Sequence, residues 1–269
     1  MAPLPSTIET SDFSVPLLGS QVFVRQWQAG PAAAAAPIVL LHDSLGCVEL
    51  WRDFPAALAR AMARPVIAYD RLGFGRSSPR TEPPSIDFIR EEAEVHFPAL
   101  AEALGLQSYL LFGHSVGGGM ALSIAAGQAG RCLGVITAAA QSFVEERTLD
   151  GIRAAKRGFE DETQFARLAR WHGERARWVL EAWTEVWLAP AFRTWSLDGV
   201  LPRIHCPVLA IHGDGDEYGS PAFPRRIVEG VRGPAQPALL AGCGHMPHRE
   251  REGEVLRLVQ AFMAAHAPA

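Results

Sequence analysis

The sequence has few cysteines and little excess charge. The 269-residue chain carries four cysteines, at positions 47, 132, 206 and 243, without a CxxC pair or a regular spacing. This usage is typical of free buried thiols in a reducing compartment and not of a disulfide framework. The formal net charge is −4, too small to indicate a nucleic-acid-binding protein.

Membrane and secretion signals are also missing. No apolar run approaches the ~20 residues that cross a bilayer. Residues 1–18 lack a basic stretch followed by an apolar one, so we expect no secretory signal. We therefore predict a cytoplasmic protein with no membrane or nucleic-acid partner. The sequence leaves a homodimer open.

Short apolar runs alternate with longer amphipathic stretches along the chain. An alternating run at 22–27 indicates an early antiparallel strand, and residues 51–63 and 90–104 indicate helices. Almost wholly apolar runs, expected where helices cover both faces of a parallel sheet, lie at 38–41, 66–69, 109–112, 133–139, 208–212 and 238–241. This alternation predicts a doubly wound α/β sheet.

The interval between the runs at 133–139 and 208–212 breaks this rhythm, and it exceeds an ordinary crossover connection. Its residues have helical periodicity and include five of the seven tryptophans: Trp171, Trp178, Trp183, Trp187 and Trp195. We interpret residues 141–204 as a helical cap, inserted between the parts of one core at 1–140 and 205–269. An ordinary helical layer is the alternative.

The segment GHSVG, residues 113–117, follows the run at 109–112. The pattern G-x-S-x-G between a strand and a helix is typical of a nucleophile elbow, in which the serine occupies a strained, tight turn. Gly113 and Gly117 stand where a side chain would clash with neighbouring backbone. Neither a Rossmann nor a Walker glycine pattern is present, which disfavours phosphate binding. The pattern predicts Ser115 as a nucleophile.

A serine nucleophile needs a base, and the base needs an orienting acid. His245, in the segment GCGHMPH after the last apolar run, is the predicted base, with His248 and His114 as rivals. The segment GDGDEYGSP offers Asp216 as the predicted acid, with Asp214 as the second choice.

The oxyanion of a tetrahedral intermediate also needs two donors. The backbone N–H of Val116 is one, and we expect the other at Ser44, with Leu45 as the alternative. The predicted substrate pocket comprises Asp43, Leu45, His114, Trp183 and Trp187.

These segments together resemble the α/β-hydrolase superfamily. VLLHDSLG, VIAYDRLGFGRSS, LLFGHSVGGGMAL, PVLAIHGDGDEYGSP and GCGHMPHRE match its motifs in type, order and spacing. The resemblance implies an eight-stranded sheet, a Ser115–Asp216–His245 triad, a helical cap after the sixth strand, and no cofactor or metal. It gives Asp70 a structural role. Serine at the elbow excludes the mechanism of those members that use aspartate there.

One residue departs from the family pattern. Many members have His-Gly in the loop that supplies the second oxyanion donor, where this chain has His42-Asp43. A carboxylate facing a developing oxyanion would oppose it, by several kcal/mol at short range in a pocket of low dielectric constant. Asp43 must point away, be paired or be protonated, unless it contacts a polar substrate or leaving group. We favour a structural explanation.

The predicted activity is that of a carboxylesterase-like serine hydrolase, which cleaves ester-like bonds through an acyl-enzyme. The tryptophan-rich interval favours a small to medium apolar or aromatic substrate. A carbon–carbon bond hydrolase or a perhydrolase with the same triad is the alternative within the enzymes. A small-ligand receptor or signalling protein with slow or no turnover is the alternative from another class.

Overall fold

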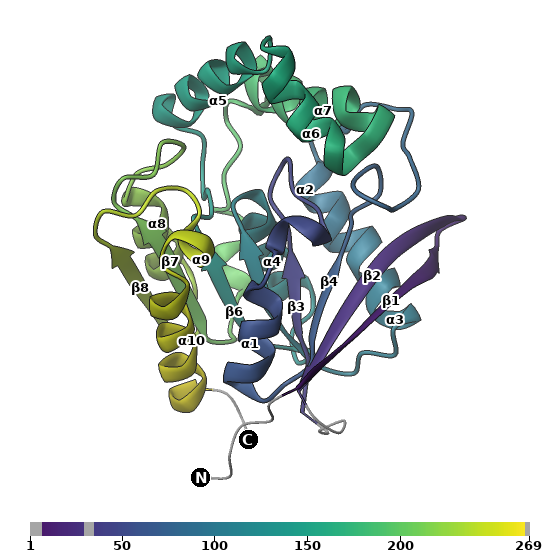
Figure 1. The fold of residues 1–269 in the computed structure, drawn as a ribbon. Helices are drawn as coiled ribbons and strands as arrows, with labels where there is room; N and C mark the ends of the chain where they lie inside the picture. Colours follow the sequence, from purple (N-terminus) through teal and green to yellow (C-terminus); the bar gives the residue numbers. More distant parts are fainter. Residues whose placement is uncertain (1–6, 30–34, 267–269) are drawn as a thin grey trace.

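A computed structural model describes residues 7–29 and 35–266 of the chain. Its eight strands form one sheet in the order β1-β2-β4-β3-β5-β6-β7-β8, in which β2 is antiparallel to both of its neighbours, β1 and β4, and all other pairs are parallel (Figure 1). The strands are β1 Ile8–Leu17, β2 Ser20–Ala29, β3 Ile38–Leu41, β4 Val66–Tyr69, β5 Tyr109–His114, β6 Cys132–Ala138, β7 Val208–Gly213 and β8 Ala235–Leu240. The eight-stranded α/β fold predicted from the sequence is confirmed.

Helices cover both faces of this sheet. The helices are α1 Phe54–Met62, α2 Phe88–Glu91, α3 Phe97–Ala103, α4 Val116–Gly127, α5 Glu146–Gly158, α6 Glu162–His172, α7 Ala176–Leu188, α8 Ala222–Gly230, α9 Pro247–Glu250 and α10 Glu252–His266. Single 3-10 turns lie at Val48–Trp51, Gly173–Arg175, Pro190–Phe192 and Leu201–Arg203.

Alternate residues of the central strands belong to two different hydrophobic cores, because successive side chains of a strand point to opposite faces. Ile38 and Leu40 of β3 pack in the core formed with α1 and α10. Val39 and Leu41 pack in the core formed with α3, α4 and α8. Both faces are buried, which explains why the central strands β3 and β4 are apolar along their whole length.

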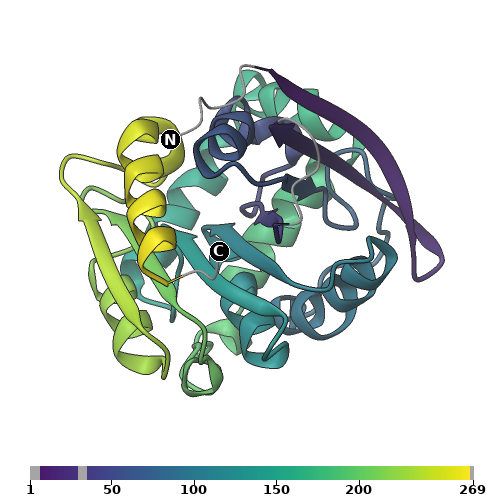
Figure 2. The same ribbon diagram turned by 90° about the horizontal axis from the view of Figure 1, so that it is seen from below.

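The sequence analysis did not predict strand β1. It pairs with β2 along its whole length, from Ile8 opposite Ala29 to Leu17 opposite Ser20. Only Val15 and Leu17 of its ten residues are buried. The strand lies at the edge of the sheet (Figure 2), and most of its length has no buried face to give it an alternating apolar pattern.

Strand β8 and the helix predicted at 90–104 are among the elements whose bounds differ from those predicted. Strand β8 begins at Ala235 and contains Pro237, which the sheet tolerates because β8 is an edge strand. The helix predicted at 90–104 consists of α2, a π-helical turn at Glu92–His96, and α3. Residues 1–6 of the stretch interpreted as lacking a secretory signal lie outside the described residues. In the described ranges, no helix is long and apolar enough to cross a membrane.

Three helices, α5, α6 and α7, lie between β6 and β7 in the chain. Figure 1 shows them beyond the carboxyl ends of the parallel strands, where the loops that follow β3, β5, β7 and β8 also converge. Carboxyl ends of parallel strands are the edge at which α/β sheets bind ligands. The helical character expected for residues 141–204 is present, and their role as a cap stays a prediction.

Candidate active site

Ser115 lies between β5 and α4 in a strained backbone conformation. Its φ is 54° and its ψ is −127°, a conformation that costs a non-glycine residue about 1–3 kcal/mol. Its N–H donates to the main-chain oxygen of Ala138 at 2.9 Å, which fixes the turn against β6. A Cβ on Gly113 would overlap the main chain of Gly117, and one on Gly117 would overlap the main-chain oxygen of Leu41. The two glycines therefore permit this turn.

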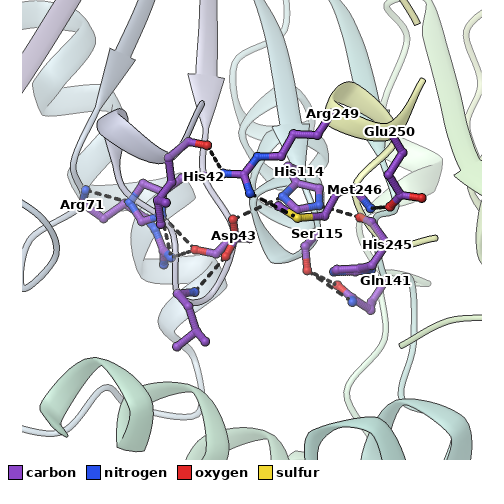
Figure 3. A network of polar contacts seen from close by, with 12 residues as sticks. His42, Asp43, Arg71, His114, Ser115, Gln141, His245, Met246, Arg249 and Glu250 are labelled. Atoms are coloured by element: carbon purple, nitrogen blue, oxygen red, sulfur yellow. Dashed lines mark hydrogen bonds and ion pairs between the residues drawn. The ribbon is translucent and has the colours of Figure 1, made fainter. Parts of the chain in front are cut away.

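Ser115 is buried, and its hydroxyl contacts Gln141 (Figure 3). Its Oγ lies 3.4 Å from the oxygen and 3.4 Å from the nitrogen of the Gln141 side-chain amide. Among the described residues, Ser115 Oγ has no hydrogen bond to His245. Ser115 and His245 line the same cavity, and catalytic hydrogen bonds are often long until a substrate binds.

His245 and Asp216 form a direct pair. Nδ1 of His245 lies 2.9 Å from each carboxylate oxygen of Asp216. The Asp216 side chain is fully buried, accepts the N–H of Tyr218 at 2.7 Å, and lies 3.4 Å from Nε2 of His212. Because Nδ1 faces a carboxylate, it carries a proton, which leaves Nε2 free to accept one.

The pair shifts the pKa of both members. Burial lowers the pKa of His245, but the hydrogen bond and charge of Asp216 raise it more, so the net pKa lies above its ordinary value. Burial raises the pKa of Asp216, and the bond and charge of His245 outweigh that effect, so its net pKa lies below its ordinary value. Asp216 therefore favours the imidazolium that forms when His245 accepts a proton.

The rival residues have other surroundings. His248 is buried against the rings of Trp51 and Phe54, with ring centroids 4.9 Å and 5.4 Å away. Asp214 accepts the N–H of Gly242 at 2.7 Å and so holds the turn after β8. Asp70, implied by the resemblance to be structural, is buried and accepts main-chain N–H groups of two neighbouring loops.

The two expected oxyanion donors lie at the same edge of the sheet. Val116 is the first residue of α4, so its N–H is one of the unpaired donors at the helix N-terminus. Ser44 follows β3 and lines the cavity that contains Ser115. The Leu45 N–H, the alternative donor, is already bonded to the Asp43 carboxylate at 2.9 Å, which favours Ser44.

Asp43 points toward His114 (Figure 3). Its Oδ2 lies 3.3 Å from Nδ1 of His114, and Nε2 of His114 lies 2.8 Å from the main-chain oxygen of His245. The Asp43 side chain is about one quarter exposed and the His114 side chain is buried. His114 is thus a link between the loop after β3 and the loop after β8.

A cavity of about 290 Å³ contains Ser115. Its apolar lining consists of Leu45, Leu50, Ile152, Trp183, Trp187, Tyr218 and Met246. Its polar lining consists of Asp43, Ser44, His114, Ser115, Gln141, Thr148, Glu217, His245 and Arg249. A second cavity of about 30 Å³ adjoins it and shares Ser44, Trp183 and Trp187.

All five residues predicted for the pocket line this cavity. Sequence reasoning missed Gln141 and Tyr218, although a signal existed for each. Gln141 follows β6 by three residues, and Tyr218 follows Asp216 by two, so both stand at strand exits like the residues that were predicted. The ring of Tyr218 lies 4.8 Å from that of His245. Ile152 had no such signal, because it comes from the helical segment α5.

Known proteins match the chain along most of its length. The family described as "alpha/beta hydrolase fold" matches residues 36–252. The chain belongs to this family. A relative of this α/β hydrolase is the 2-hydroxymuconate semialdehyde hydrolase of Pseudomonas sp. (strain CF600), 26% identical over 257 residues, which are 87% of this chain and 88% of that protein.

One further relative of this α/β hydrolase matches a short segment of its sequence, and another matches nearly its whole structure. The 1-acylglycerol-3-phosphate O-acyltransferase ABHD5 of Sus scrofa is 43% identical over 89 residues, 32% of this chain. The match spans only 24% of that protein's length. The proline iminopeptidase of Mycobacterium smegmatis has a similar structure, with a TM-score of 0.75, 23% identity, and coverage of 95% of this chain and 98% of that one. At this identity the likeness shows the fold alone.

Metal and cofactor binding were not expected from the sequence. Within residues 7–29 and 35–266, no group of three or more His, Cys, Asp or Glu side chains is arranged to hold a metal ion. The expectation that the enzyme needs no cofactor stays a prediction.

Proposed function

We propose that this α/β hydrolase cleaves ester-like bonds with Ser115 as nucleophile, His245 as base and Asp216 as orienting acid. The observation that carries the proposal is their arrangement. A serine on a strained turn shares one cavity with a histidine whose far nitrogen is bonded to a buried carboxylate. Such a buried carboxylate holds the imidazole in the tautomer that accepts a proton.

In the proposed reaction, Nε2 of His245 takes the hydroxyl proton as Ser115 Oγ attacks the carbonyl carbon of the substrate. The N–H groups of Val116 and Ser44 stabilise the oxyanion. The imidazolium then gives its proton to the leaving oxygen, and the acyl group stays on Ser115. Water attacks the acyl-enzyme with His245 again as base, and the acid leaves as Ser115 recovers its proton.

The cavity supports a small to medium substrate with an apolar or aromatic part. A volume of about 290 Å³ lies near the lower end of the range for small-molecule pockets, about 300–1,000 Å³. Trp183 and Trp187 of α7 and Ile152 of α5 line the cavity. We propose that residues 141–204 act as a cap whose side chains select the substrate.

The test replaces Ser115 with alanine and measures turnover of short-chain chromogenic esters. Ser115→Ala should lower kcat by about 10⁴- to 10⁶-fold. A matched control is Ser123→Ala on α4, since that hydroxyl donates to the main chain of Gly119 at 2.9 Å within the helix. Undiminished turnover in Ser115→Ala would refute the proposal.

Assays on the wild-type protein distinguish two alternative functions from ester hydrolysis. A carbon–carbon bond hydrolase is favoured by the match to 2-hydroxymuconate semialdehyde hydrolase over 88% of that protein. Such an enzyme would turn over vinylogous diketones in preference to esters. For a receptor or signalling protein, a phosphonylating reagent would label Ser115 stoichiometrically while ester turnover is negligible.

A further inference from the structure

Asp43 and His114 connect two loops of the proposed active site. The Asp43 carboxylate accepts the N–H of Leu45 at 2.9 Å and lies 3.3 Å from Nδ1 of His114. Nε2 of His114 lies 2.8 Å from the main-chain oxygen of His245. The residue after Asp43 is Ser44, the proposed oxyanion donor. Any net charge on Asp43 therefore stands close to the atom on which negative charge develops.

The two contacts of His114 fix the number of protons on the pair. A main-chain oxygen can only accept a hydrogen bond, so Nε2 of His114 must carry a proton. An ionised carboxylate also only accepts, so Nδ1 must carry a second proton if Asp43 is ionised. If Nδ1 is bare, Asp43 must be protonated and donate to it. Both arrangements have a net charge of zero.

Two neighbouring imidazoles add no charge to the pair, and the nearby cations that interact with Asp43 are Arg71 and Arg249. The ring of His248 lies 4.6 Å from that of His114, and burial holds the pKa of His248 well below its ordinary value, so it is neutral. Burial also holds the pKa of His42 well below its ordinary value. The Arg71 guanidinium donates to the main-chain oxygen of Asp43 at 2.8 Å, while the carboxylate faces His114.

Burial raises the pKa of the Asp43 carboxyl, but the hydrogen bond and charge of His114 outweigh it and hold that pKa well below its usual range. A hydrogen bond between an ionised Asp43 and the ring of His114 is charge-assisted, and such bonds are about twice as strong as neutral ones. The ring of His114 also donates to the main-chain oxygen of His245 and so contacts the loop that carries the base.

We propose that Asp43 and His114 form a net-neutral pair that shares one proton, and that this pair cancels the carboxylate charge beside the oxyanion hole while it ties the oxyanion loop to the loop of His245. Both are positioning residues, since neither needs to touch the reacting atoms. The kinetic consequences rest on the proposed function, whereas the charge state of the pair does not.

The kinetic test compares His114→Gln, Asp43→Asn and the double variant. In His114→Gln, the glutamine amide can still donate to the main-chain oxygen of His245, but Asp43 loses its counter-charge. At a separation of about 6 Å and an effective dielectric constant of about 20, that charge should lower kcat about 100-fold. KM should stay within about threefold, because the oxyanion forms only in the transition state.

Asp43→Asn should lower kcat by at most about tenfold, and by less than His114→Gln, because the asparagine can accept the Leu45 N–H and donate to a neutral His114. The double variant should recover kcat to within about tenfold of the wild type, since no unpaired charge remains. A role that depends only on packing would give no such recovery. Thermal unfolding of each variant shows whether it is folded.

Three kinetic results would overturn the proposal. They are a fully active His114→Gln enzyme, a folded double variant as slow as His114→Gln, and a kcat more than about tenfold lower in Asp43→Asn. Nitrogen and carboxyl-carbon NMR of the wild type tests the pair without turnover. We expect the pair to hold both protons, one on Nε2 and one shared. A bare Nδ1 beside an ionised Asp43 would refute it. If the wild type hydrolyses no ester, the proposed function is wrong. The NMR result still shows whether Asp43 and His114 form a net-neutral pair.

Discussion

The close approach of α4 to β3 can be tested by adding one methyl group, with the substitution Gly117→Ala. A Cβ on Gly117 would overlap the main-chain oxygens of Leu41 and His42, far inside the ~3.5 Å at which nonbonded atoms make favourable contact. The obstacle is backbone in a central strand, so a side-chain rotation cannot relieve it. Gly117→Ala should therefore lower the free energy of unfolding by about 3 kcal/mol, at the upper end for overpacking.

Gly119→Ala is the matched control in the same helix. Its added Cβ would lie 3.7 Å from the Trp195 ring, its nearest neighbour, so it causes no clash. Replacing glycine inside a helix should stabilise the protein by about 0.5–1 kcal/mol.

The assay is thermal unfolding followed by ester hydrolysis. Because 1 kcal/mol shifts Tm by about 2–4 °C in a domain of 150–250 residues, Gly117→Ala should melt about 6–12 °C lower and Gly119→Ala slightly higher. The displaced turn should also lower kcat about 100-fold in Gly117→Ala, the effect of a ~1 Å misplacement. Equal Tm and kcat in the two variants would refute the elbow geometry as the reason for glycine at 117.

Three further predictions concern the site. Asp216 raises the pKa of His245 above its ordinary 6.5, and the base acts only when neutral, so kcat/KM should fall as pH drops through a value above 6.5; a midpoint below pH 6 in a pH–rate profile would contradict this. Asp216→Asn can still accept the Tyr218 N–H but favours the wrong imidazole tautomer, so its kcat should fall about 10⁴-fold with Tm nearly unchanged. Trp183 lines both cavities. Trp183→Ala should therefore join them and shift the optimum in a chain-length series of esters to longer acyl groups, and an unchanged optimum would argue against this pocket.

Buried strands were predictable because burial on both faces leaves a purely apolar run. Strands β3 and β4 occupy the residues expected from the sequence, 38–41 and 66–69. Strand β1 was not predictable, since most of its side chains face solvent and do not form an apolar pattern. The π-helical turn at Glu92–His96 has no sequence signal either, because amphipathic periodicity hardly changes over five residues.

The residues of the site were predictable where they follow a strand directly. Ser115, Asp216 and His245 each stand one to five residues beyond a strand end, and chain order then indicates their neighbours in space. The position of Ile152 depends on how α5 packs, which periodicity does not determine. The sequence shows that Asp43 departs from the family pattern. Its contact with His114 depends on how the loop after β3 is positioned relative to the end of β5.

The order in which the elements occur along the chain separates the nucleophile from its activators in time. A ribosome makes β5 and Ser115 long before β8 and His245, and at about 5–20 residues per second the interval is on the order of ten seconds. During that interval the emerging polypeptide has the serine but not the imidazole, and it lacks the carboxylate until Asp216 is made, 29 residues before His245. Catalysis by the proposed triad can therefore begin only after β8, at the edge of the sheet, has docked. An incomplete chain on the ribosome would therefore not hydrolyse the substrate.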